Sequence, residues 1–218
     1  MSAQPPSVPS PRLGDLSLTA FAERVAARTP TPGGGSVAAY LAELGCALTA
    51  MAFRFTSGEK FATVEAALAR QVEELERLRT AVRPLVDEDT DAYDAVTAAY
   101  KLPKATDAEK AVRSAAIQRA LLGALEVPAR TLAHATAALR AAGAGAAAVN
   151  PNLASDASTG VWCLRSAAEA AFHNVRINAQ SLADKALGAQ RLAACEAELR
   201  SARELSEAAQ AVIATKLS

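Results

Sequence analysis

The sequence predicts an all-α protein built as a single-domain bundle of long helices. Ala, Leu, Glu, Arg and Gln recur at three- and four-residue spacings over almost the whole chain, which is typical of helices. No segment shows the two-residue alternation or the Val/Ile/Thr-rich runs of β-strands. The chain has 218 residues, 51% of them apolar, which is enough to bury one core.

The spacing predicts helices at 15–27, 34–56, 60–83, 84–100, 107–142, 152–187 and 191–216. The breaks between them hold turn residues and are too short to be domain linkers. Pro128 predicts a kink or break inside the fifth helix. Residues 1–14 are rich in Pro and Ser and are expected to form a disordered tail without a secretion signal, so the helical domain is 15–218.

Many small residues on long helices imply that the helices approach one another closely. Few large side chains fill the gaps, so part of the apolar surface is expected to be buried against another subunit. A homodimer is therefore expected.

Composition argues against several classes of partner. The 23 basic and 23 acidic side chains cancel and aromatic residues make up 4%, so nucleic acid is not an expected partner. Cys46, Cys163 and Cys195 are odd in number and widely separated, which indicates reduced thiols of a cytoplasmic protein. His134 and His173 have no second ligand at metal spacing, so no metal is expected.

A glycine run stands before the second predicted helix. Gly33, Gly34, Gly35 and Ser36 lack the lysine of a phosphate-binding loop and the preceding strand of a dinucleotide fold. Bare amides at a helix N-terminus still favour an anion or the close approach of a flat ligand, and Ser36 can cap the helix. The alternative is a tight turn that leads into a buried helix.

The helix that follows is apolar enough to raise the question of a membrane. A spanning helix needs about 20 nearly uninterrupted apolar residues. Glu43 lies near its middle and Arg54 near its end, so the sequence favours a buried core helix and no membrane.

An acidic run opens the fourth predicted helix. Asp89 shares one helix face with Leu85 and Tyr93, so its carboxylate lies within an apolar stripe and needs either a partner or a function. Burial would raise its pKa toward the range useful for proton transfer. A salt bridge to an arginine on a neighbouring helix is the alternative.

The sixth predicted helix combines a capping motif with polar residues. Asn150 resembles a helix cap with Pro151 at the first helical position, but capping does not account for Ser155 and Asp156.

Further along the same predicted helix, Asn174, Asn178, Ser181 and Asp184 form a polar seam. Such a seam suits a ligand with several hydrogen-bonding edges, such as a pterin ring. An interhelical hydrogen-bond network is the alternative.

Taken together, short motifs resemble one family. They are PTPGGGSVAA at 30–39, D-x-x-A-Y at 89–93, LPK at 102–104, E-x-x-x-R at 109–113, NPN-x-x-SDA at 150–157 and NV-x-x-N at 174–178, followed by Asp184. In this order, over 21–187, they are similar to the cyclodeaminase domain of formiminotransferase-cyclodeaminase. Stand-alone bacterial members are similar to methenyltetrahydrofolate cyclohydrolases as well.

The resemblance implies an all-helical dimer that binds tetrahydrofolate derivatives as substrates, with no metal and no covalently bound cofactor. It implies conversion of 5-formiminotetrahydrofolate to 5,10-methenyltetrahydrofolate with release of ammonia. A cyclohydrolase would open the same methenyl ring with water to give 10-formyltetrahydrofolate. The motifs do not separate the two activities, and a non-catalytic folate-binding or dimeric helical module is the competing class.

The matching motifs supply the candidate site residues. The candidates for proton transfer are Asp89, Asp156 and Asp184. The candidates for substrate binding are Gly33, Gly34, Gly35, Ser36, Asn150, Asn152, Ser155, Asn174 and Asn178, with Lys104 and Arg113 for the glutamyl tail. Two positions depart from the family pattern: Val149 replaces a glycine and Glu43 replaces a small residue.

Overall fold

The computed structural model describes residues 12–217, and within this range the chain forms helices and no strand. The α-helices are α1 (Leu18–Ala26), α2 (Gly34–Arg54), α3 (Ala62–Val82), α4 (Leu85–Tyr100), α5 (Asp107–Ala146), α6 (Ala154–Ser181) and α7 (Lys185–Ala214). Short 3-10 turns occur at Leu13–Asp15, Glu59–Phe61 and Pro151–Leu153. The all-α bundle predicted from the sequence is confirmed.

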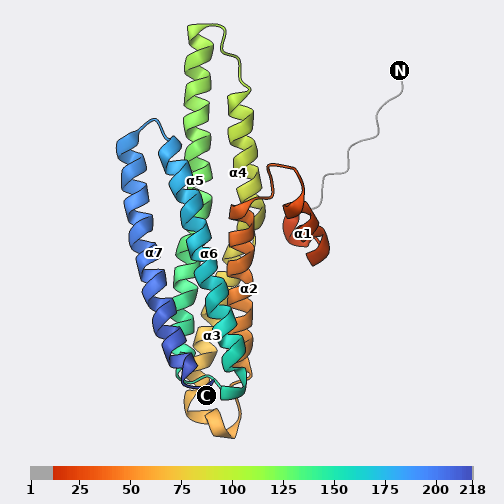
Figure 1. The fold of residues 1–218 in the computed structure, drawn as a ribbon, viewed down its shortest axis with the longest axis vertical. Helices are drawn as coiled ribbons and strands as arrows, with labels where there is room; N and C mark the ends of the chain where they lie inside the picture. Colours follow the sequence, from red (N-terminus) through yellow and green to blue (C-terminus); the bar gives the residue numbers. More distant parts are fainter. Residues whose placement is uncertain (1–11, 218) are drawn as a thin grey trace, which may run out of the picture.

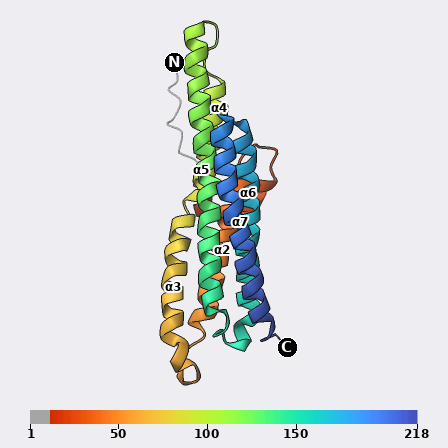
Figure 2. The ribbon, with the colours of Figure 1, turned by 90° about the vertical axis from the view of Figure 1, so that its left-hand side faces the viewer.

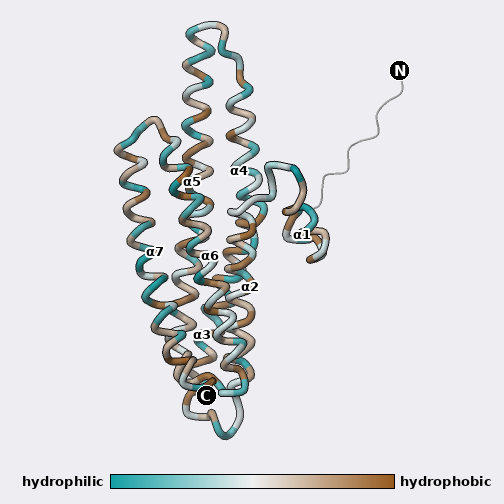
Figure 3. Tube along the Cα trace, viewed as in Figure 1, coloured by the Kyte–Doolittle hydropathy of each residue, from teal (hydrophilic) through white to brown (hydrophobic). Residues whose placement is uncertain are grey.

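The long helices lie side by side along one axis (Figures 1 and 2). The helices α2, α5 and α6 pack on one another, α3 lies along one half of α5, and α7 packs against α5 and α6. The α4–α5 hairpin extends beyond the other helices at one end, and α1 lies beside the N-terminal end of α2. Apolar residues recur along each long helix (Figure 3), which is the pattern that buries a shared core.

Glycines set how closely α2 and α6 approach. A Cβ atom at Gly45 would lie 2.7 Å from Leu164 and 2.9 Å from the Gly160 carbonyl oxygen. A Cβ atom at Gly160 would lie 2.4 Å from the Thr49 hydroxyl. These spacings leave no room for larger residues, so the close helix packing expected from the small residues is present between these two helices.

Of the kink or break expected at Pro128, the break is wrong, because α5 continues through this residue and is 40 residues long. Proline has no N–H group, so in a helix it leaves the carbonyl four residues earlier without its usual donor. That carbonyl belongs to Ala124, and the side-chain amide of Asn178 donates a hydrogen bond to it at 2.7 Å. A neighbouring helix thus supplies the donor that α5 lacks.

The sixth helix is shorter than expected. It ends at Ser181, Leu182 is extended, and a new helix starts at Lys185. The Asp184 carboxylate accepts a hydrogen bond from the Leu187 N–H at 2.9 Å and so caps α7. The expectation that Asp184 continues the polar seam of Asn174 and Asn178 is therefore wrong.

The described chain begins earlier than the predicted helical domain. Leu13 is buried, and the Asp87 carboxylate accepts hydrogen bonds from the Leu13 N–H at 2.7 Å and the Gly14 N–H at 3.3 Å. Residues 12–14 thus pack on α4 and do not belong to a tail. The rest of the predicted tail, residues 1–11, lies outside the described residues.

The helix α2 has the length and composition of a membrane span, and 56% of its most apolar window is buried inside the protein. Glu43 is largely buried within this helix and lies 3.8 Å from the Arg79 guanidinium of α3. Glu43, which stands where a small residue was expected, thus forms an ion pair between α2 and α3.

Candidate functional site

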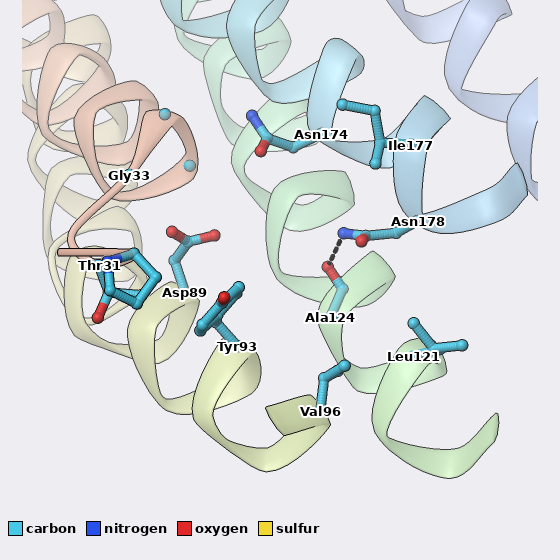
Figure 4. Close-up of a pocket in the computed structure, with 13 residues that line it drawn as sticks. Thr31, Gly33, Asp89, Tyr93, Val96, Leu121, Ala124, Asn174, Ile177 and Asn178 are labelled. Carbon is cyan, nitrogen blue, oxygen red and sulfur yellow. Dashed lines mark hydrogen bonds between the residues drawn. The ribbon is translucent and has the colours of Figure 1, made fainter. Parts of the chain in front are cut away.

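A pocket of about 330 Å³ opens where the N-terminus of α2 meets α4, α5 and α6 (Figure 4). Its volume is at the lower end of the range for small-molecule sites. The lining residues are Pro30, Thr31, Gly33, Gly34, Gly35, Asp89, Tyr93, Val96, Leu121, Ala124, Asn174, Ile177 and Asn178. The glycine run, the acidic motif and the two asparagines, far apart in the sequence, therefore meet at one place.

The carboxylate of Asp89 caps α2 from the neighbouring helix. Its Oδ2 atom accepts a hydrogen bond from the Ser36 N–H at 2.9 Å and another from the Ser36 hydroxyl at 3.0 Å. The first turn of a helix has unpaired N–H groups and a partial positive charge, both of which favour a carboxylate. The expected capping is reversed, because the Ser36 side chain donates to Asp89 and does not cap its own helix.

Gly35 makes this approach possible. A Cβ atom at this position would lie 2.0 Å from Oδ1 of Asp89, closer than any real contact. Gly34 is different, since a Cβ atom there would meet Asn174 at an ordinary 3.6 Å. One glycine of the run thus admits the carboxylate, while its neighbour faces the α6 side of the pocket.

Two opposing effects set the pKa of Asp89. Burial raises the pKa, because desolvation disfavours the charged form, and the two hydrogen bonds from Ser36 lower it. Burial is the larger effect, so the pKa lies above its ordinary value. No salt bridge to Asp89 occurs among the described residues, which leaves the arginine alternative unsupported. Such a carboxyl group can both accept and donate a proton.

The helix α6 presents two amides on the opposite wall (Figure 4). Asn174 donates a hydrogen bond to the Ala170 carbonyl at 2.9 Å, and Asn178 donates to Ala124 at 2.7 Å. Each amide uses one N–H in these contacts. The carbonyl oxygen and the second N–H can serve a ligand.

Tyr93 and Ile177 also line the pocket and were not among the predicted site residues. Tyr93 follows Asp89 by one turn of α4, and its exposed fraction is 43%. The helix periodicity that placed both residues on one face was the signal that could have identified it. A tyrosine ring beside a carboxylate offers a flat apolar surface to a planar ligand.

The NPN-x-x-SDA residues lie elsewhere. Asn150 accepts a hydrogen bond from the Asn152 N–H at 3.1 Å, and its own N–H donates to the Thr56 hydroxyl at 3.0 Å at the far end of α2. Asp156 precedes Asn174 on α6 by 18 residues, a helix length of roughly 27 Å. The pocket and the cluster Asn150, Asn152, Ser155 and Asp156 are thus at opposite ends of the α2–α6 pair.

The predicted cations lie at the tip of the α4–α5 hairpin. Arg113 donates hydrogen bonds at 3.2 and 3.1 Å to the Tyr100 carbonyl and so ties the two helices together. It precedes the pocket residue Leu121 by eight residues, roughly 12 Å along the helix. Lys104 is exposed in the connecting turn. The exposed Asp184 does not line the pocket either.

Metal ligands do not gather in the part of the chain that the structure describes. Among residues 12–217, no three His, Cys, Asp or Glu residues lie close enough to hold a metal ion.

The fold and the pocket define a class: a helical bundle with a pocket that is lined by one carboxylate, two amides and a helix N-terminus. The family profile described as formiminotransferase-cyclodeaminase matches residues 17–197. The chain therefore belongs to the formiminotransferase-cyclodeaminase family, as the resemblance implied.

Proteins similar to this chain match it over different shares of their own length. Methenyltetrahydrofolate cyclohydrolase of Methylorubrum extorquens is 36% identical over 94% of this chain and 99% of its own length. Formimidoyltransferase-cyclodeaminase of Rattus norvegicus is 35% identical over 83% of this chain, which corresponds to 34% of the rat protein. The crystal structure of formiminotetrahydrofolate cyclodeaminase from Thermotoga maritima matches 94% of this chain with a TM-score of 0.83 at 27% identity.

Proposed function

We propose that the protein is a folate one-carbon enzyme that converts 5-formiminotetrahydrofolate to 5,10-methenyltetrahydrofolate and releases ammonia. The observation that carries this proposal is the half-buried Asp89 carboxyl group, held at the N-terminus of α2 beside the amides of α6. Family membership supports the substrate class, and the similarity to the Thermotoga maritima cyclodeaminase supports the reaction.

The proposed reaction needs one proton relay. N10 attacks the carbon of the protonated formimino group (N5–CH=NH₂⁺) and forms a tetrahedral centre. The proton on N10 must leave and a proton must reach the departing nitrogen, after which the C–N bond breaks and ammonia is released. Asp89 would take the first proton and deliver the second, because its raised pKa lets it serve in both roles. Of the described residues that line the pocket, it is the one carboxylate.

Holding N10 against the formimino carbon supplies the rest of the rate enhancement. Well-oriented intramolecular reactions gain roughly 7 to 11 kcal/mol from fixed geometry. In the proposed complex, Asn174 and Asn178 would bind hydrogen-bonding edges of the pterin and Tyr93 would lie against its ring. The bare backbone at Gly33 and Gly34 would let the ligand approach closely.

Methenyltetrahydrofolate cyclohydrolase is the second candidate. It is favoured by the Methylorubrum extorquens relative, which matches over 99% of its own length. In this reaction Asp89 would take a proton from a water molecule that attacks the methenyl carbon. The bond from this carbon to N5 would then break as N5 takes a proton and the hydroxyl loses one, which gives 10-formyltetrahydrofolate and a net release of one proton. Both reactions pass through a tetrahedral carbon between N5 and N10, so the same pocket suits both.

Steady-state assays of the purified protein with both folates test the proposal. Growth of the methenyl absorbance from 5-formiminotetrahydrofolate supports the cyclodeaminase, and its decay to the 10-formyl product supports the cyclohydrolase. Binding of both compounds without turnover would contradict the proposal and indicate a non-catalytic folate-binding module.

Three further properties are proposed with this function. The reaction uses no metal, so chelator treatment should leave turnover unchanged. The protein acts in the cytoplasm, which the three free cysteines support. It forms a homodimer, supported by the exposed apolar residues Leu44 of α2 and Phe55 directly after this helix. Light scattering tests the dimer, because a monomer at assay concentration would contradict it.

A further inference from the structure

The helix α2 carries an apolar stripe that the bundle leaves partly uncovered. Its members recur at three- and four-residue spacings along one side of the helix. They are Val37, Leu41, Leu44, Leu48, Met51 and, at the C-cap position directly after the helix, Phe55. Leu44 is 42% exposed and Phe55 is 65% exposed, and the other four are half-buried. The stripe contains no charged residue, so water is a poor partner for it.

The helix α6 continues this surface with a stripe of its own. Exposed residues with the same spacing run along it: Ser155, Thr159, Trp162, Ser166, His173 and Ile177. Trp162 is 55% exposed and Ile177 is 62% exposed. One end of this stripe lies in the NPN-x-x-SDA cluster, and the other end lines the Asp89 pocket.

The two stripes form one face. The helices are antiparallel and meet where Gly45 packs on Gly160 and Leu164. When each helix is viewed from its own N-terminus, its stripe is rotated away from this contact line in the same direction on both helices. For antiparallel helices this places them on the same side of the pair. We call this surface the α2/α6 face.

We propose that a second copy of the chain packs antiparallel on the α2/α6 face and that its Asn150–Asp156 segment completes the pocket around Asp89. The shared site rests on the proposed function for its chemistry. The proposed packing does not depend on that function. It is inferred from the exposed residues and the helix geometry of the α2/α6 face.

Two-fold symmetry can bring the NPN-x-x-SDA cluster of one copy next to the Asp89 pocket of the other. In a two-fold dimer each copy uses the same patch, so a contact between two positions occurs twice. Ser166 is the midpoint between Ser155 and Ile177. An axis near Ser166 that reverses the helix direction brings Ser155 of one copy to Ile177 of the other. A parallel dimer would leave the clusters roughly 27 Å apart.

Side-chain sizes match this register. The same axis sets Trp162 opposite the small residues Ser166 and Ala170 of the second copy. A large exposed ring against small side chains fills space without a clash. The face is about 30 Å long and about two helix widths across, which gives on the order of 600 to 800 Å² per copy, close to a standard interface.

The pocket has a side that a second copy can close. The exposed Ile177 forms part of its rim, and the Asp89 wall lies across from it. The partner's Asp156 would bring a second carboxylate and the partner's Asn152 a third amide. Adjacent N–H groups, such as those on the pyrimidine edge of a pterin, are recognised by a carboxylate with two parallel hydrogen bonds. The partner's Asp156 is therefore assigned to substrate binding.

Complementation between inactive variants tests the shared site. Asp89→Asn and Asp156→Asn are each expected to lose turnover. After mixing in equal amounts and subunit exchange, half of the dimers contain both variants, and each of these has one intact site, so about a quarter of wild-type activity should return. The matched control mixes Asp89→Asn with Asn174→Ala. Asp89 and Asn174 line the same pocket within a single chain. Each pocket of a mixed dimer would therefore carry one of the two substitutions, so mixing should restore nothing.

Two results would overturn the proposal. Full turnover by Asp156→Asn would show that this segment is not part of the site, and no recovery in the first mixture would show that the chains do not share one.

A disulfide cross-link tests the packing without an activity assay. In a chain whose three native cysteines are replaced by alanine, Ser155→Cys with Ile177→Cys should form a covalent dimer on mild oxidation, and Ser155→Cys alone should not. Cross-linking in a protein that turns over neither folate would retain the packing and reject the proposed function. Turnover with neither cross-link nor complementation would retain the function and reject the shared site.

Discussion

Asp89 of α4 accepts two hydrogen bonds from Ser36 of α2, from the backbone N–H at 2.9 Å and from the hydroxyl at 3.0 Å. The contact spans 53 positions of the sequence. It uses an N–H group at the start of α2, which has no partner within the helix, to hold a half-buried carboxylate at the pocket wall.

Asp89→Asn should lower turnover by about a hundred- to ten-thousand-fold, because the amide cannot relay a proton. The amide oxygen can still accept from Ser36, so circular dichroism and substrate binding should change little. Asp91→Asn is the control, since Asp91 is an exposed carboxylate paired with Arg12. Equal turnover in both variants would reject Asp89 as the proton relay.

Ser36→Ala should shift the pH profile of kcat/KM to higher pH. The Ser36 hydroxyl bond lowers the pKa of Asp89 against the larger effect of burial, so its loss raises this pKa further. A reaction that begins with ionised Asp89 then needs a higher pH to reach half of its maximum. Ser181→Ala removes an exposed hydroxyl bonded to its own helix and should leave the profile in place. A shift to lower pH would contradict this account.

Gly35→Ala should abolish turnover and lower the free energy of unfolding by about 1 to 3 kcal/mol, because the new methyl group overlaps the Asp89 carboxylate. Gly34→Ala meets only an ordinary contact and should remain stable. Adding Asp89→Ala to Gly35→Ala should restore stability without activity, since the overlap is removed along with the proton relay. Chemical denaturation and activity assays separate these outcomes.

Pro128→Ala should raise the melting temperature and reduce kcat/KM by about fivefold, which corresponds to about 1 kcal/mol. The new N–H group at position 128 can donate to the Ala124 carbonyl and competes with Asn178 for it. Gly123→Ala, at a position with open space, should also stabilise α5 but leave activity unchanged. If Pro128→Ala keeps full kcat/KM, this carbonyl does not hold Asn178 in its working position.

Glu169→Gln should destabilise the protein at neutral pH and not near pH 2. Hydrogen bonds from Arg203 and Arg165 lower the pKa of Glu169 to about 2. A lowered pKa contributes stability that is present above the unfolded value and is lost as the pH falls to about 2. The carboxylate is partly exposed, so we expect a loss of about 1 kcal/mol. Glu74→Gln, in a more exposed pair, should have a smaller effect on melting temperature.

Local spacing was sufficient to predict the helices and part of the site. Helix periodicity placed Asp89 and Tyr93 on one face, and the structure brings both into the same pocket. Turn chemistry located the start of α2 at the glycine run. Such features depend on residues a few positions apart, so they can be identified without knowledge of the fold.

Boundaries that depend on distant partners were predicted less well. Local sequence predicts a kink or break at Pro128, because proline removes a backbone hydrogen bond, yet Asn178 of α6 supplies a donor in the same place and the helix does not break. Local spacing places Asp184 in the polar seam of Asn174 and Asn178, whereas in the structure it caps α7 and does not line the pocket. For Pro128 the decisive partner, Asn178, is 50 residues away in the sequence. For Asp184 the decisive feature is that a new helix starts at Lys185.

The sequence by itself determined the helical class, the family motifs and the residue types that a folate site would need. The tertiary structure decided which of those residues meet. It joined Gly35, Asp89, Asn174 and Asn178 in one pocket and left Asp156 at the far end of α6. The physical reason is that motif order along a chain carries no information about the packing of antiparallel helices. That packing brings distant segments together and separates residues of the same helix by its length.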